Sequence, residues 1–98
     1  MDYQITWTAP AIEGLGENVR QIAQDNAPAA LTVGLELIAH MEVAVHFPRI
    51  GPLYSQTGIV EIRCLTHGNY RLYSQLGLRP NAIEVVADRH TAREQPKF

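Results

Sequence analysis

Apolar residues recur along the chain with two different spacings, and the change of spacing separates strands from helices. Residues 3–8, YQITWT, alternate β-branched or aromatic side chains with polar ones, which predicts a strand. Steps of three and four follow in two successive segments, which predicts two helices that each have one apolar face. The apolar positions of these segments are Ile12, Leu15, Val19, Ile22 and Ala23, then Leu31, Leu35, Ile38, Met41 and Val45.

The ends of both predicted helices carry recognisable signals. Thr8 and Asn26 are residue types that cap helix N-termini, and Pro10 and Pro28 follow in the first turns, where no N–H is needed. Pro48 disfavours the helical conformation for the residue before it and so ends the second helix. The connector between the helices is short, so we expect an antiparallel hairpin.

The second half of the chain has the period of strands. Residues 48–58 are rich in Pro and Gly and are predicted to form a loop. Three runs, 59–66, 70–76 and 82–88, then follow with short turns between them, which favours an antiparallel meander. The predicted order is βααβββ. We expect one α+β domain over residues 1–98, with the helical hairpin packed on one face of a twisted, mainly antiparallel sheet.

Alternation along these strands predicts which residues share a face. The set expected beneath the helices is mostly apolar and consists of Val60, Ile62, Cys64, Tyr70, Leu72, Ser74, Ile83, Val85 and Ala87. The opposite set is polar and consists of Glu61, Arg63, Arg71, Tyr73, Gln75 and Glu84. This polar face leads directly into Arg89, His90 and Arg93, so we expect a surface of arginine and tyrosine that another macromolecule covers.

Composition narrows the classes of protein. The one cysteine, Cys64, excludes an internal disulfide, and no cysteine spacing suits a metal ion, so neither metal nor cofactor is expected. We find no secretory signal and no apolar run near the roughly 18 residues of a membrane span, so a cytoplasmic protein is expected.

Charge is divided unevenly along the chain. Residues 1–48 carry six acidic side chains and one arginine, a balance of −5, whereas residues 49–98 carry seven cationic and four acidic side chains, a balance of +3. Such a division can orient a charged partner. It is too small to give high affinity for nucleic acid by itself.

Five stretches, in this order, carry a likeness to a known family. They are ITWTAPAIEGL, IAQDNAPAA, HFPRIG, VEIRCLTHGNYRLYSQ and IEVVADRHTARE. Together they resemble the RelE/ParE superfamily of bacterial type II toxins, and DNAPAA, FPRIG and EIR…YRLY look closer to the ParE branch. The resemblance implies an antitoxin that wraps the toxin in a hetero-oligomer, and a complex that represses its own operon.

The superfamily contains two activities. ParE-like members inhibit DNA gyrase, whereas RelE-like members are endoribonucleases that cut mRNA on the ribosome. A ParE-like reading assigns partner binding to Arg63, Arg71, Tyr73, Arg89, His90 and Arg93. In the nuclease alternative Arg63, Arg71, His90 and Arg93 would be catalytic, because RNA cleavage needs cations and a proton donor or acceptor.

Two features favour the gyrase inhibitor. The chain has a net charge of −2 and one lysine, Lys97, although a ribosome-bound nuclease docks on dense phosphate. Its last residue is Phe98, which lacks the hydroxyl of the tyrosine common in nuclease tails. Pro52, where the family often has Arg, and the weakly basic HTARE leave a third alternative open, a non-toxic remnant that acts as a binding module.

Ordinary structural roles also fit some of these residues. Arg71 could pair with Glu61 or Glu84 across strands, and His90 could end a strand and bond to backbone or to Asp88. For the antitoxin, the helical hairpin offers a surface to an amphipathic helix, and the sheet edge offers pairing to an extended segment.

Overall fold

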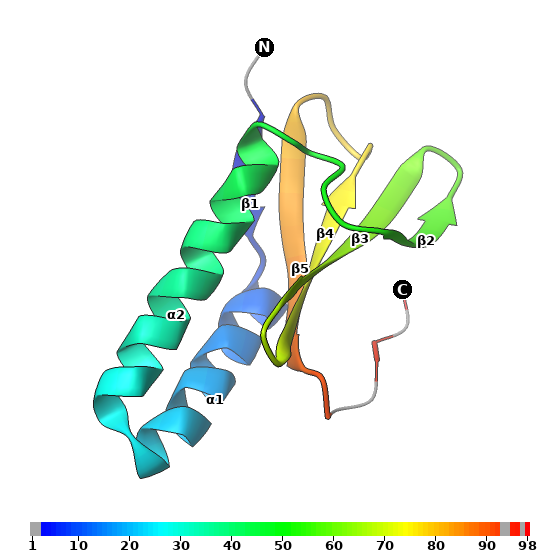
Figure 1. Cartoon of the computed structure of the whole chain (residues 1–98). Helices are drawn as coiled ribbons and strands as arrows, with labels where there is room; N and C mark the ends of the chain where they lie inside the picture. The colour runs from blue at the N-terminus through cyan, green and yellow to red at the C-terminus, as the bar shows by residue number, and fades with distance from the viewer. Residues whose placement is uncertain (1–2, 93–94, 97) are drawn as a thin grey trace.

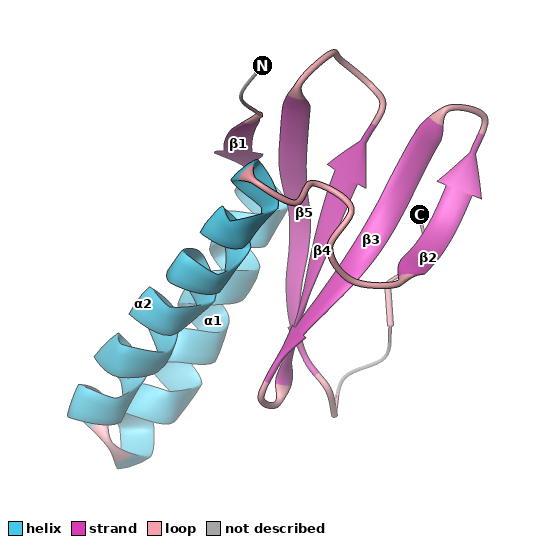
Figure 2. Cartoon of the chain, turned by 45° about the horizontal axis from the view of Figure 1, so that its top comes forward, coloured by secondary structure: helices cyan, strands magenta, loops and turns pink. Residues whose placement is uncertain are grey.

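Two helices lie on one face of a five-stranded sheet in the computed structural model, which describes residues 3–92, 95–96 and 98 (Figure 1). The elements in chain order are β1 (Gln4–Trp7), α1 (Ala9–Asp25), α2 (Ala27–Glu42), the 3-10 turn η1 (Val43–Val45), β2 (Leu53–Thr57), β3 (Val60–His67), β4 (Tyr70–Leu76) and β5 (Ala82–His90). The strand order is β1-β5-β4-β3-β2, with β1 parallel to β5 and every other pair antiparallel (Figure 2). The predicted α+β fold with its helical hairpin is confirmed.

The two predicted helix starts are confirmed, although one cap acts differently from expectation. Asn26 caps α2 in the expected way, because its Oδ1 accepts a hydrogen bond from the backbone N–H of Ala29 at 3.1 Å. Thr8 precedes α1, but its hydroxyl donates to the backbone oxygen of Val85 at 2.8 Å. Thr8 therefore ties the start of α1 to the neighbouring strand β5.

One strand lies where a loop was predicted. The edge strand β2 runs antiparallel to β3, and Gly58 in the tight turn between them has a φ of +61°. Its sequence, LYSQT, is short and follows Pro52, so it gives a weak strand signal. Pairing with β3 supplies the hydrogen bonds that the local sequence does not predict.

The predicted assignment of β3 side chains to the two sheet faces is wrong. Leu65 pairs with Leu72 and belongs to the core beneath the helices, so its neighbour Cys64, which pairs with Tyr73, lies on the opposite face. Ile62 lies on that opposite face too. The register of β3 against β4 decides this, and a slip of one residue exchanges the faces of a whole strand.

A β-bulge changes the faces again in β5. Ser74 pairs with Val85 and the adjacent Tyr73 pairs with Ala87, so Val86 is the extra residue. Val85 remains in the core beneath the helices, whereas Ala87 belongs to the cluster on the opposite face, contrary to the prediction. The bulge thereby turns Asp88 toward α1.

The contact of α1 with β5 is unusually close. A Cβ atom on Gly14 would lie 2.5 Å from the backbone oxygen of Asp88, which is closer than a Cβ atom approaches a non-bonded oxygen. Four residues along the same helix face, Asn18 Nδ2 donates to Asp88 Oδ1 at 3.2 Å. Both Asn18 and Asp88 are buried, and Asp88 Oδ2 has no hydrogen-bond partner among the described residues.

The second helix and the 3-10 turn after it form a longer apolar run than predicted. Ala27–Val45 is long and apolar enough to cross a membrane, although Glu36 and Glu42 interrupt the run. One such helix is weak evidence for a membrane protein, because a core helix passes the same test. Leu37 and Met41 on this helix are buried in the core against the sheet.

Substitution of Gly14 by Ala is expected to lower the free energy of unfolding by about 1–3 kcal/mol, because the added methyl forces α1 away from β5. Gly16→Ala is the matched control. Its Cβ would lie 3.2 Å from the flexible Arg20 side chain, and alanine favours a helix over glycine by up to about 1 kcal/mol. Urea denaturation measures the free energy of unfolding of both variants. Equal changes in Gly14→Ala and Gly16→Ala would contradict the close contact of α1 with Asp88.

The stability of the protein is expected to fall as the pH rises from 4 to above 6. Burial raises the pKa of Asp88 from 3.8 to about 6, with the hydrogen bond from Asn18 opposing the shift. The unfolded chain thus releases this proton at lower pH than the folded one. The protonated Asp88 therefore contributes its full stabilisation below pH 3.8. This contribution to the free energy of unfolding, about 3 kcal/mol, is lost as the pH rises through about 6.

Asp88→Asn keeps the side-chain shape and removes the ionisation, so this variant should lack that part of the pH dependence. The quantity to measure is the free energy of urea unfolding of both proteins between pH 4 and pH 8. Parallel curves for the two proteins would show that Asp88 does not titrate in this range.

Candidate functional site

The sheet face turned away from α1 and α2, called here the outer face, has an apolar centre. Its cluster consists of Tyr54, Ile62, Cys64, Tyr73, Val86 and Ala87. The ring of Phe98 lies over this cluster, 5.9 Å from the ring centroid of Tyr54 and 5.6 Å from that of Tyr73. The hydroxyl of Tyr54 also donates to the backbone oxygen of Pro96. The outer face is therefore partly covered by the chain's own end.

Tyr73 lies inside this cluster instead of on a polar surface. Its relative exposure is 0%, and its hydroxyl has no hydrogen-bond partner among the described residues. Burial raises the pKa of Tyr73 to about 12. The expectation that Tyr73 is exposed on a polar face is wrong, because the centre of the outer face is apolar.

Arg63 lies on the other face of the sheet, with Leu65. Its Nη2 binds Glu61 Oε1 at 2.7 Å, and its Nη1 donates to the backbone oxygen of Gly51 at 3.4 Å. Glu61 Oε2 also pairs with Arg49 Nε at 3.1 Å. The hydrogen bond from Arg63 is the largest cause of a lowered pKa for Glu61. Arg63 therefore holds the loop before β2 against β3.

Two arginines do meet on the outer face. Arg71 and Arg89 are cross-strand partners of β4 and β5, and both are half-buried. No hydrogen bond or ion pair joins either guanidinium to another residue in the described part of the chain. The suggested pairing of Arg71 with Glu61 or Glu84 is absent, because Glu84 pairs with Arg79 at 3.6 Å. Arg71 and Arg89 thus form a cationic patch, and Arg93 lies outside the described residues.

His90 has the structural role that the sequence left open. Its Nδ1 accepts a hydrogen bond from the backbone N–H of Ala92 at 3.0 Å. Its ring stands edge-on to Tyr70, its cross-strand partner, at a centroid distance of 5.2 Å and an angle of 88°. His90 therefore closes the end of β5 and shares the face of Tyr70, opposite to Arg71.

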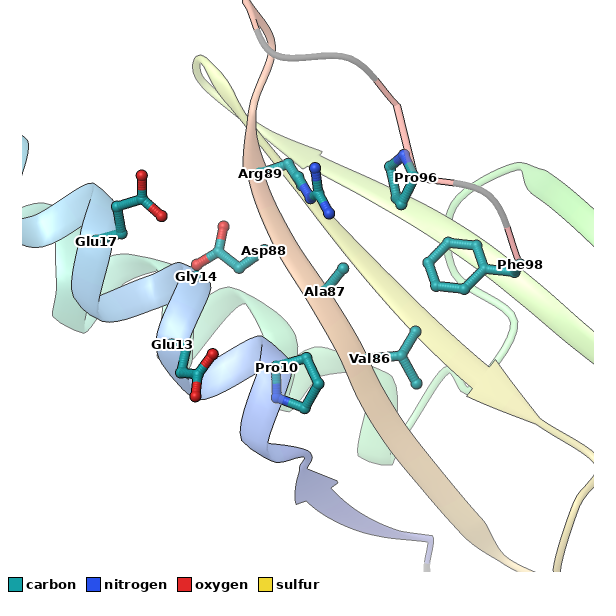
Figure 3. A pocket seen from close by; sticks show the side chains of 10 residues that line it. All are labelled: Pro10, Glu13, Gly14, Glu17, Val86, Ala87, Asp88, Arg89, Pro96 and Phe98. Atoms are coloured by element: carbon teal, nitrogen blue, oxygen red, sulfur yellow. The ribbon is translucent and has the colours of Figure 1, made fainter.

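A cleft of about 490 Å³ lies between α1, β5 and the end of the chain (Figure 3). Glu13 and Glu17 on α1 and Asp88 on β5 lie on one side of it, and Arg89 lies nearer to Pro96 (Figure 3). Sequence reasoning missed this cleft, because the bulge in β5 decides that Asp88 faces α1 and that Arg89 lies on the outer face.

A second surface runs along the helical hairpin, and we call it the hairpin groove. It is lined by Leu15, Val19, Ala30, Leu31, Gly34, Leu35 and Ile38. Leu31 and Leu35 are 65% and 59% exposed. The periodicity predicted one apolar stripe on α2, with Leu31, Leu35 and Met41 on the same face. In the structure Met41 fills the core together with Leu37, whereas Leu31 and Leu35 face outward. A helix that is apolar on two sides is expected to bury the second one against a partner.

The described residues contain no group of three or more His, Cys, Asp or Glu side chains that could hold a metal ion.

The fold has known relatives. Residues 5–95 match the family described as the ParE toxin of the type II toxin–antitoxin system, parDE. The chain is similar to a protein of the chromosomal ParDE TA system from P. aeruginosa, with a TM-score of 0.70, 12% identity and coverage of 90% of this chain and 95% of that one. It is also similar to a chain of the archaeal RelE-RelB complex from Pyrococcus horikoshii OT3, with a TM-score of 0.56, 14% identity and coverage of 96% and 100%.

No curated protein sequence matches the chain. The two structural likenesses, at such low identity, concern the fold. The family match is of a different kind, because it extends over residues 5–95. It includes both helices, strands β2 to β5, all of β1 except Gln4, and the cationic patch. The chain belongs to the ParE toxin family of type II toxin–antitoxin systems.

Proposed function

We propose that this ParE-family toxin inhibits DNA gyrase and that a cognate antitoxin neutralises it. The match to the ParE family supports DNA gyrase as the target. One geometric observation also favours gyrase over the ribosome. The described residues that a nuclease would need do not converge. Arg71 lies on the outer face, whereas Arg63 and His90 share the opposite face with Leu65 and Tyr70.

Arg63 and His90 also already have hydrogen-bond partners within the chain. Arg63 is bound to Glu61, and the Nδ1 atom of His90 is bound to the backbone of Ala92. General acid–base catalysis requires a group within hydrogen-bond reach of the reacting proton, together with cations at the developing charge. A ribonuclease mechanism would have to bring Arg71 and His90 together from opposite faces of one sheet.

The cationic patch is the part of the site that suits a protein target. Arg71 and Arg89 are held side by side by the register of β4 and β5, and the exposed ring of Phe98 lines the same cleft as Arg89. Arginine and aromatic side chains are the residue types that most often contribute binding energy at protein interfaces. We therefore assign the gyrase contact to Arg71 and Arg89, with Phe98 beside them.

The hairpin groove is proposed as the antitoxin site. An amphipathic helix places an apolar face into such a groove, and Leu31, Leu35 and Ile38 provide the matching surface. The edge strand β2 offers backbone pairing to an extended segment of the same antitoxin. The basic second half of the chain would attract acidic antitoxin residues. A soluble hetero-oligomer in the cytoplasm follows from this proposal.

Leu35→Glu is expected to weaken antitoxin binding at least about tenfold, because it places a charge in an apolar contact. Leu35 is exposed, so the variant should fold with the stability of the parent protein. Leu78→Glu is the matched control, since Leu78 is 56% exposed and lies outside the hairpin groove. Calorimetric titration with the antitoxin encoded by the adjacent gene measures the affinity, and an equal loss for Leu78→Glu would contradict this site.

Gyrase inhibition is tested with purified enzyme and relaxed plasmid. The toxin should block supercoiling, and Arg71→Glu should raise the concentration for half inhibition at least about tenfold, because the charge of the patch is reversed. Arg79→Glu, at an exposed arginine on the turn before β5, is the control and should inhibit like the parent.

Programmed ribosomes distinguish the alternatives. The parent protein should leave the mRNA on these ribosomes intact. The His90→Ala variant should inhibit gyrase as strongly as the parent. Message cleavage that is lost in His90→Ala would replace the proposal with the nuclease. Absence of any growth defect or gyrase effect would point to the non-toxic binding module.

A further inference from the structure

Two histidines from distant parts of the sequence meet where α2 crosses the end of β3. His40 Nδ1 and His67 Nδ1 lie 3.0 Å apart, and the two rings are inclined by 68° with centroids 4.9 Å apart. The other ring nitrogen of His67, Nε2, lies 3.1 Å from Glu36 Oε2. The three side chains thus connect α2 to the end of β3, and none of them lines the hairpin groove.

Glu36 decides which nitrogen of His67 carries the proton. A carboxylate only accepts hydrogen bonds, so the contact with Glu36 places the proton of a neutral His67 on Nε2. The Nδ1 atom of His67 then presents its lone pair to His40. The 3.0 Å contact then requires a neutral His40 to donate from its Nδ1 to the Nδ1 of His67. A cation that takes the place of this proton, with His40 protonated on Nε2 instead, would use the lone pairs of both Nδ1 atoms.

We propose that His40 and His67 bind a divalent transition-metal ion of the zinc type. Zinc–imidazole bonds of about 2.0–2.1 Å at a tetrahedral angle separate two ligand nitrogens by about 3.3 Å. The observed 3.0 Å needs only a small opening to reach that distance. A metal-bound histidine usually donates its second N–H to a carboxylate, which orients the ring, and Glu36 has this relation to His67.

The protein supplies two ligands at this site, so the remaining coordination positions belong to water or to a group from a bound partner. The side chain of His67 is 32% exposed and that of Glu36 is 53% exposed, which leaves a path for an ion to enter. Imidazole nitrogen suits zinc, copper and nickel, whereas magnesium prefers oxygen ligands. The site should therefore discriminate sharply between Zn²⁺ and Mg²⁺.

Ion binding would also join two elements that are far apart in the sequence. His40 belongs to α2 and His67 ends β3, so a bridging ion links the helical layer to the β3–β4 turn. An ion that binds the folded chain more tightly than the unfolded one raises the unfolding temperature. This inference does not depend on the target of the toxin.

The experiment is calorimetric titration of the untagged protein with ZnCl₂. One equivalent should bind, His40→Ala and His67→Ala should each abolish binding, and MgCl₂ should give no binding heat. His46→Ala is the matched control, because His46 is exposed just beyond α2 and takes no part in the cluster. Glu36→Gln should weaken zinc binding about tenfold.

Thermal unfolding with and without zinc provides the second measurement. Zinc should raise the unfolding temperature of the parent and of His46→Ala, but not of His67→Ala, whose fold is checked by circular dichroism. Absence of zinc binding by the parent, or binding that survives in His67→Ala, would overturn the proposal. Unchanged affinity of Glu36→Gln would remove the positioning role of Glu36.

Discussion

One extra residue in β5 determines how the faces of this protein are divided. Without Val86 as a bulge, the alternation that places Val85 in the core would place Ala87 there as well and turn Asp88 outward. The bulge instead directs Asp88 beneath α1 and leaves Arg89 on the outer face beside Arg71. Bulges often redirect a side chain near a functional site, at the cost of local pairing. The close contact at Gly14 and the cationic patch both follow from that displacement.

The structure has two hydrophobic clusters of different kinds. The cluster beneath the helices is enclosed by α1, α2 and the sheet, and its most buried side chains include Leu37, Leu72 and Ile83. The cluster of the outer face is smaller and is closed in part by the ring of Phe98. A sheet with apolar residues on both faces needs a cover on both, and here the helices supply one and the end of the chain supplies the other.

Much of the fold could be predicted from sequence because its signals are local. The cap at Asn26, the helical period of α1 and α2 and the turns of the β3–β5 meander depend on residues close together in the chain. The site was less accessible, because the register of β3 and the bulge at Val86 depend on pairing between strands. Arg71 and Arg89 were recognised as candidates, but the burial of Tyr73 and the pairing of Arg63 with Glu61 were not. Asp88 drew notice only as a charged neighbour, since no sequence pattern reveals that a carboxylate lies beneath a helix.

The exposed leucines of the hairpin groove affect the solubility of the toxin. An uncovered apolar strip that includes Leu31, Leu35 and Ile38 favours self-association as the protein concentration rises. An antitoxin seated there would act as a chaperone as well as an inhibitor. Without such a cover, the solubility of the free chain limits how much of it can accumulate.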